Sequence, residues 1–235
     1  APAAYYFPSV SRMSSVEVRK GSSQIKYGPY TTGGAINFIS TRIPYEFSGN
    51  AELSAGQFNS RQLAASIGDT KGNMGYLIES RFLSNDGFKE LDNQANTGFD
   101  VTDILAKFMI KTDNDASVFQ KLEAKIGYYD ERSDETYLGL TETDFERTPY
   151  RRYAASQEDV MNADQTQLSL RYFAQLNSNI DITTTLYHNE FNRNWYKLDK
   201  VNGTSISSIL DNPTANASAY DIITGGTSGD DALTV

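Results

Sequence analysis

Residues 100–111, Asp-Val-Thr-Asp-Ile-Leu-Ala-Lys-Phe-Met-Ile-Lys, alternate between two kinds of side chain. Successive side chains of a β-strand point to opposite sides, so one face of this stretch carries mainly apolar groups and the other carries charges. The first face holds Thr102, Ile104, Ala106, Phe108 and Ile110, and the second holds Asp103, Lys107 and Lys111. A soluble strand usually has about 5–6 residues, whereas a tilted membrane-spanning strand needs about 9–11. The stretch therefore predicts a strand long enough to cross a bilayer.

The same period of two recurs before and after this stretch. Residues 118–128 and 165–176 alternate in the same way over a similar length. Shorter or less regular alternation is found at residues 51–56, 62–67, 76–82 and 181–196. Together these segments predict about seven antiparallel strands.

The connectors between the segments are alternately short and long. The short ones, residues 69–73, 113–115 and 177–179, are polar and suited to tight turns. The long ones, residues 85–98, 130–162 and 199 to the end, are rich in Asp, Asn, Thr and Gly. Bacterial outer-membrane barrels have short periplasmic turns and long outer loops, which predicts the same placement here. An open sheet of seven strands would leave backbone groups unpaired in lipid, so we expect further strands beyond Val235.

Composition limits the class of protein. The net charge of −9 argues against a nucleic-acid binder, because phosphate contacts need clustered Lys and Arg. The absence of Cys excludes disulfides and thiolate metal sites. No apolar run approaches the length of a membrane-spanning helix, whereas 15 Tyr and 12 Phe favour a strand-rich chain.

The sequence predicts neither a catalytic site nor a metal site. His188 is the single histidine, and it has neither a serine motif nor a second histidine beside it. The acidic residues between 130 and 135 are interpreted as solvated loop charges. We therefore do not expect an enzyme.

Three motifs precede the alternating segments: Val16-Glu17-Val18-Arg19-Lys20-Gly21, Tyr27-Gly28-Pro29, and Gly33-Gly34-Ala35-Ile36-Asn37-Phe38-Ile39. Their order and spacing resemble the C-terminal part of the plug in TonB-dependent outer-membrane receptors. Together with loop residues 137–140 and 149–153, they look most like the ferric-citrate receptor branch. The resemblance divides the chain into the end of a plug, residues 1–44, and the first part of a barrel, residues 45–235.

The resemblance implies an all-β fold, a transmembrane antiparallel barrel with 22 strands in the intact protein and about seven here. It implies active import of a ferric siderophore or ferric citrate across the outer membrane of a Gram-negative bacterium. The implied partners are the TonB–ExbB–ExbD complex, the ferric chelate and outer-membrane lipid, with no cofactor and with iron only as chelated substrate. The alternatives are an importer of cobalamin or glycans, a passive porin or adhesion barrel, and a soluble β-sandwich.

Several motif residues are expected to have structural roles. The glycines Gly21, Gly28, Gly33 and Gly34 permit positive φ and close backbone approach, and Tyr27 and Asn37 complete the motif. Glu17 and Arg19 lie two apart, on one face of a strand. They are expected to pair with barrel-wall residues such as Arg81, Glu123 or Lys125, as the family implies, and the alternative is solvated surface charge.

Candidate ligand contacts combine guanidinium groups with aromatic rings: Tyr30, Arg147, Tyr150, Arg151 and Arg152. Guanidinium groups match carboxylate-rich anions with two parallel hydrogen bonds, and an anionic ferric chelate fits that chemistry. The competing interpretation is that these arginines pair with nearby acids and order the loop.

Overall fold

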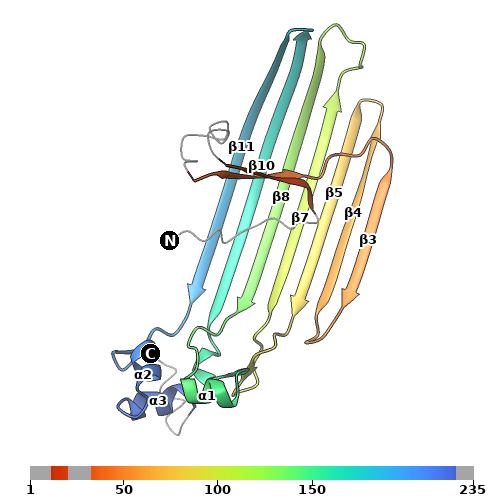
Figure 1. The fold of residues 1–235 in the computed structure, drawn as a ribbon. Helices are drawn as coiled ribbons and strands as arrows, with labels where there is room; N and C mark the ends of the chain where they lie inside the picture. Colours follow the sequence, from red (N-terminus) through yellow and green to blue (C-terminus); the bar gives the residue numbers. More distant parts are fainter. Residues whose placement is uncertain (1–11, 21–32, 226–235) are drawn as a thin grey trace.

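The structure is a computed structural model that describes residues 12–20 and 33–225 of the chain. Its largest element is a seven-stranded sheet in which strands that follow one another in the chain are antiparallel neighbours (Figure 1). The strands are β3 (Ser48–Ala55), β4 (Arg61–Lys71), β5 (Met74–Asn85), β7 (Phe99–Lys111), β8 (Phe119–Asp134), β10 (Val160–Asn177) and β11 (Ile180–Tyr196). The predicted number of long strands is confirmed, and so is the antiparallel β fold.

Two details of the connectors differ from the predictions. β8 and β10 pair as far as Asp134 and Val160, so the long connector is residues 135–159 and not 130–162. The hydrophilic character of these strand ends concealed them, because polar strand ends and loops have similar composition. The connector between β3 and β4, residues 56–60, is short although it lies at the same end of the sheet as the long ones (Figure 1).

The burial of the two faces is the reverse of that in a soluble protein. On β7, Asp103 and Lys107 are 2% and 4% exposed, whereas Ile104 and Phe108 on the opposite face are 37% and 49% exposed. The sheet thus has an apolar exposed face, called here the outer face, and a charged, partly covered face, called the inner face. This arrangement is typical of a sheet whose outer face lies against lipid.

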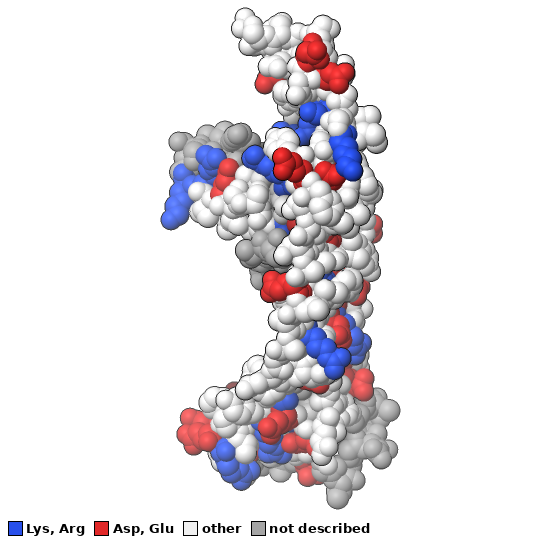
Figure 2. Space-filling model, turned by 90° about the vertical axis from the view of Figure 1, so that its right-hand side faces the viewer, with Lys and Arg blue, Asp and Glu red and all other residues white. Residues whose placement is uncertain are grey.

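A separate hairpin covers part of the inner face. It consists of β1 (Met13–Arg19) and β2 (Ala35–Ser40), which pair antiparallel and run across the strands of the large sheet (Figure 1). Viewed along the edge of the sheet, the hairpin projects from one side, and that side is hollowed between the hairpin and the loops at the far end (Figure 2). The inner face therefore borders a recess with the hairpin at one end.

The long connectors fold together into a small body at one end of the sheet, called here the loop body (Figure 1). Its helices are α1 (Glu142–Arg147), α2 (Ile206–Asp211) and α3 (Ala217–Ile223), with a 3₁₀ helix η3 (Ala154–Ser156). Short strands complete it: β6 (Glu90–Leu91) pairs parallel with β9 (Arg151–Arg152), and β12 (Lys200–Val201) pairs antiparallel with β13 (Thr204–Ser205). Its core is apolar and comprises Leu138, Tyr153, Ala155, Val201, Ile209, Ala219 and Ile223.

The helices of the loop body are absent from the sequence-based expectations, which treated these connectors as irregular loop. Each helix has only six or seven residues, too few for a clear helical period of apolar positions. Within the described part of the chain, no helix has both the length and the apolar character needed to span a membrane.

Candidate functional site

The segment around the hairpin is anchored to the inner face by buried polar contacts, which we call the anchor. Arg12 pairs with Asp103 on β7 at 2.6 Å, and the two side chains are only 9% and 3% exposed. Lys107 Nζ donates a hydrogen bond to the Thr41 carbonyl oxygen at 2.5 Å. Glu79, on neighbouring β5, is 5% exposed and hydrogen bonded to Thr41. Arg12 and Thr41 lie beside each other at the open end of the hairpin, so this end is attached to the inner face by charged groups of two adjacent strands.

A second contact follows a few residues later in the chain. Thr70 Oγ1 donates a hydrogen bond to the Pro44 carbonyl oxygen at 2.6 Å. Gly68 and Gly75 admit this segment, because a Cβ at Gly68 would lie 2.7 Å from Pro44 Cδ and one at Gly75 would lie 2.9 Å from Ile43. The small residues of β4 and β5 thus allow the incoming chain to lie close to the sheet.

The predicted plug residues occupy the hairpin itself. Arg19 and Glu17 form an ion pair with each other at 3.1 Å, and Asn37 Nδ2 donates to Glu17 Oε2 at 3.4 Å across the hairpin. Their pairing with Arg81, Glu123 or Lys125 stays a prediction. The observed contacts between the hairpin segment and the inner face are made by Arg12 and Lys107. The sequence predicts the charged face of Lys107 and Asp103 but not these two contacts.

The motif glycines fall into two groups. Gly34 has φ +132°, and a Cβ there would lie 2.9 Å from the Arg19 carbonyl oxygen, so the hairpin needs glycine at this position. Gly33 has open space around it and shows no such need. Gly21, Tyr27, Gly28 and the candidate ligand residue Tyr30 lie outside the described residues.

The loop body is organised around the buried carboxylate of Asp144. Tyr153 and Tyr220 donate hydroxyl hydrogen bonds to its Oδ2 at 2.7 and 2.8 Å, and Arg147 and Arg151 pair with it at 3.1 and 3.4 Å. Burial alone would raise the pKa of Asp144, but the two tyrosine hydrogen bonds and the two arginine charges outweigh it and hold the pKa below its ordinary value. Asp144 thus joins α1, the segment after it and α3.

The candidate ligand residues lie within or beside this network. Arg151 donates two hydrogen bonds to Asp92, at 2.8 and 3.1 Å, which raise the pKa of its guanidinium and connect loop 86–98 to loop 135–159. Arg152 donates to the Pro149 carbonyl oxygen at 2.9 Å. Tyr150 is 58% exposed and packs edge-to-face against Phe88, with ring centroids 6.0 Å apart.

These contacts bear on the two interpretations of the arginines. The carboxylates of Asp92 and Asp144 occupy the position that an anionic ligand would take on Arg147 and Arg151. This favours their role in ordering the loop. Contact between ligand and Arg147, Tyr150, Arg151 or Arg152 stays a prediction.

A second group of cations and rings lies on the inner face, at the loop end of β11. Arg193 lies over the Trp195 ring with its Cζ 4.4 Å from the centroid, and Lys197 Nζ is 5.7 Å from the centroid of Tyr137. The Trp195 and Tyr137 rings are 5.4 Å apart. Sequence reasoning left the facing of β11 open and missed this group, because Tyr137 comes from a different connector.

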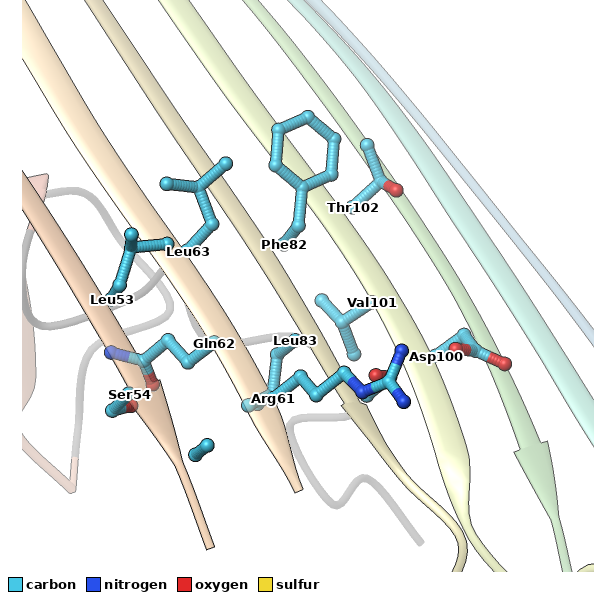
Figure 3. Close-up of a pocket in the computed structure, with 12 residues that line it drawn as sticks. Leu53, Ser54, Arg61, Gln62, Leu63, Phe82, Leu83, Asp100, Val101 and Thr102 are labelled. Carbon is cyan, nitrogen blue, oxygen red and sulfur yellow. The ribbon is translucent and has the colours of Figure 1, made fainter. Parts of the chain in front are cut away.

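A surface groove lies on the other side of the sheet. Leu63, Phe82 and Thr102 come from neighbouring strands and share one face, with Arg61 and Asp100 nearer the loop end (Figure 3). Their register places Phe82 and Thr102 on the face that carries Ile104, which is the outer face. The groove therefore belongs to the outer face and not to the recess beside the hairpin.

The acidic side chains that the structure describes do not form a metal centre. Among residues 12–20 and 33–225, no group of three or more His, Asp or Glu side chains is arranged to hold a metal ion. Asp134 pairs with Arg132 at 3.0 Å, and Glu131 accepts a hydrogen bond from Tyr129. These acids thus have protein partners.

Comparisons by sequence and by structure give different results. No protein-family model matches the chain, and no curated protein matches it by sequence. Among solved structures, the unliganded ferric citrate transporter FecA is similar, with a TM-score of 0.65 and 19% identity over 81% of this chain and 28% of that chain. The siderophore receptor PiuA from Acinetobacter baumannii is also similar, with a TM-score of 0.60 and 18% identity over 77% of this chain and 26% of that chain.

Both proteins are TonB-dependent receptors with β-barrels, and neither is an enzyme. The chain spans 28% and 26% of their lengths. Identities of 18–19% support a shared fold and no more. The resemblance seen in the motifs is confirmed at that level: this chain has the fold of part of a TonB-dependent receptor.

Proposed function

We propose that this chain is the end of the plug and the first part of the barrel of a TonB-dependent importer in a bacterial outer membrane. The observation that carries the proposal is the charged anchor between the hairpin and a sheet whose opposite face is apolar and exposed. The lumen of an open porin is a water-filled channel, whereas here a separate hairpin lies across the inner face. In an importer, such a segment closes the lumen until external work displaces it.

The proposed cargo is an iron chelate, either a ferric siderophore or ferric citrate. Support comes from the two similar structures, which are named as a ferric citrate transporter and a siderophore receptor. The proposed partners are the TonB–ExbB–ExbD complex and outer-membrane lipid. Import of cobalamin or glycans is the second candidate, because the same fold can serve different ligands.

The test of this function is uptake by iron-starved cells. Cells that carry the intact gene are expected to accumulate radiolabelled ferric citrate or a ferric siderophore. Accumulation should fall to background when either this gene or the gene for TonB is deleted. Equal uptake of every iron source in the three strains would contradict the proposal, and uptake of labelled cobalamin alone would favour the second candidate.

The membrane placement can be tested with two neighbouring residues of β10. Leu168 is 44% exposed on the outer face near the middle of the strand, and Gln167 points to the inner face. Leu168→Arg is expected to cost about 2–4 kcal/mol of folding free energy, because it places a charge in hydrocarbon. Gln167→Arg should cost much less, since the inner face is polar. The measurement is urea unfolding of the intact protein in lipid vesicles, and equal costs would contradict the placement.

A further inference from the structure

The groove on the outer face, called here the outer groove, combines an apolar part with two charges at one end. Its apolar part is a row of side chains that lie opposite one another on three adjacent strands: Leu53 on β3, Leu63 on β4 and Phe82 on β5. Its loop end is lined by Arg61 and Asp100 (Figure 3). The groove has a volume of about 580 Å³, and sites that bind small molecules usually have about 300–1,000 Å³.

The strand register fixes the position of the two charges. Arg61 lies opposite Ser84, and Ser84 lies opposite Asp100. Side chains directly opposite one another share a face, so Arg61 and Asp100 are both on the outer face, two strands apart. Leu63 and Thr102 follow them at a step of two and continue the same face toward the middle of the sheet. The charges therefore lie where the apolar surface ends, which is the level of lipid head groups on a membrane-spanning sheet.

Arg61 is held in place without being neutralised. Its Nε donates a hydrogen bond to Asn59 Oδ1 at 3.1 Å, and Asn59 Nδ2 donates to Asp86 Oδ1 at 3.4 Å. The Arg61 side chain is exposed, and within residues 12–20 and 33–225 it forms no ion pair. Its guanidinium thus has a fixed stem and terminal N–H groups that can donate to an anion in the groove.

Asp100 is the opposite charge at the same end of the groove. It is exposed, and in the described part of the chain it also lacks an ion pair. Arg132 lies opposite Asp100 on the side away from the groove, but its guanidinium pairs with Asp134 at 3.0 Å. The loop end of the groove therefore presents one cation and one anion, and its net charge is zero.

This pair of charges selects the chemistry of a ligand. A phosphate matches the guanidinium of Arg61, and an ammonium matches the carboxylate of Asp100. A lipid that carries only phosphate charge would place a like charge beside Asp100, which is unfavourable. A phosphoethanolamine head group has both charges on neighbouring groups, and its ammonium can donate hydrogen bonds.

We propose that the outer groove binds one phospholipid with an ethanolamine head group. Arg61 binds the phosphate, Asp100 accepts from the ammonium, and an acyl chain lies against Leu63 and Phe82. Burial of the chain on these side chains adds apolar contact to the two polar ones. The inference rests on the proposed membrane placement of the sheet and does not depend on which ligand is imported.

The test is native mass spectrometry of the purified intact protein in detergent, titrated with phosphatidylethanolamine or with phosphatidylglycerol that has the same acyl chains. The wild type is expected to bind the first molecule of phosphatidylethanolamine more tightly. Arg61→Gln should weaken that binding about tenfold, the loss that corresponds to one charge-assisted hydrogen bond. Asp100→Asn should weaken it by a similar factor without weakening the binding of phosphatidylglycerol, because the carboxylate contacts only the ammonium.

Two matched controls remove the same charges outside the groove. Lys71 is on the same strand and face as Arg61 but at the other end, and its side chain is 89% exposed. Asp164 is on the outer face of β10 and accepts a hydrogen bond from Asn192. Lys71→Gln and Asp164→Asn should each bind phosphatidylethanolamine as the wild type does. Losses equal to those of Arg61→Gln and Asp100→Asn would show a nonspecific charge effect and would overturn the proposal.

The remaining outcomes separate this inference from the proposed function. Equal affinity of the wild type for the two phospholipids would show that the groove does not select the ethanolamine group. Lipopolysaccharide that displaces phosphatidylethanolamine, and that itself binds Arg61→Gln more weakly, would assign Arg61 to a different lipid. Either result overturns the proposal and leaves import intact, because uptake is measured separately in cells. If Leu168→Arg and Gln167→Arg cost the same and uptake is independent of the gene, the inference and the proposed function both fail.

Discussion

Arg12→Met is expected to weaken the attachment of the hairpin to the sheet by about 3 kcal/mol, because it leaves the Asp103 carboxylate buried without its main counter-charge. Asp103 is 2% exposed, so water cannot replace the lost partner. The double variant Arg12→Met with Asp103→Leu removes both charges and should lose less than Arg12→Met alone. The measurement is hydrogen exchange of the β1 and β2 amides in the purified intact protein.

A matched control separates this pair from general effects of charge. Arg42 lies directly after Thr41 and is exposed, so Arg42→Met should leave the exchange of the hairpin amides unchanged. In cells, Arg12→Met should also raise susceptibility to a large hydrophilic antibiotic, because a loosened hairpin no longer closes the recess. Exchange rates for Arg12→Met equal to those for Arg42→Met would show that this ion pair does not hold the hairpin.

The same experiment compares the observed anchor with the predicted one. The sequence assigned the wall contact to Glu17 and Arg19, whose side chains are 31% and 40% exposed and paired with each other. Arg19→Met is expected to have a smaller effect than Arg12→Met, since partly exposed ion pairs contribute little. A larger effect of Arg19→Met would restore the original assignment.

The large sheet could be predicted from the sequence because its signal is local. An alternation such as that from Thr102 to Ile110 specifies both the strand and its two faces without knowledge of any other segment. The register then follows from tight turns such as residues 177–179, which leave little freedom to slip. Strand ends such as Asp134 were missed because polar residues there have no apolar partner to mark the strand.

The contacts of the inner face and of the loop body could not be predicted in the same way. Arg12 and Asp103 are 91 positions apart, and Tyr137 and Trp195 are 58 apart, by subtraction of their residue numbers. No period of two or of 3.6 relates such positions. Whether Arg12 or Arg19 contacts the inner face depends on the position of the hairpin on the sheet. No local pattern in a single sequence indicates that position.

Asp144→Ala is the substitution expected to damage the loop body most. It removes the acceptor of the Tyr220 hydroxyl and leaves the hydroxyl of Tyr153, which is 0% exposed, with only the long hydrogen bond to Thr141 Oγ1 at 3.4 Å. It also removes a carboxylate that pairs with Arg147 and Arg151. The expected cost is about 3 kcal/mol, the range for removing a buried group that accepts several charge-assisted hydrogen bonds. Hydrogen exchange of the α1 and α3 amides should rise, while exchange in β7 and β8 should not change. Glu146→Gln, an exposed acid on the same helix, is the control and should resemble the wild type.

The contribution of Asp144 to the stability of the loop body should also depend on pH. Its hydrogen bonds and ion pairs fix the direction of that dependence. Its pKa in the folded protein is below the ordinary value, so the ionised form is the one that folding favours. The stabilisation is then fully present above the unfolded pKa of about 3.9 and is lost as the pH falls through the lower, folded pKa. Burial raises the pKa of Asp159 and of Glu135, so these two carboxyl groups change the stability with pH in the opposite direction, and measurements on the wild type alone would mix these effects.

The informative quantity is the difference between the wild type and Asp144→Asn in the protection of the α1 and α3 amides against hydrogen exchange, after correction for the intrinsic exchange rate at each pH. That difference should be constant from pH 7 to about pH 5 and should shrink below about pH 4, near the unfolded pKa. A difference that persists unchanged at the lowest pH would mean that the charge of Asp144 does not hold the loop body together.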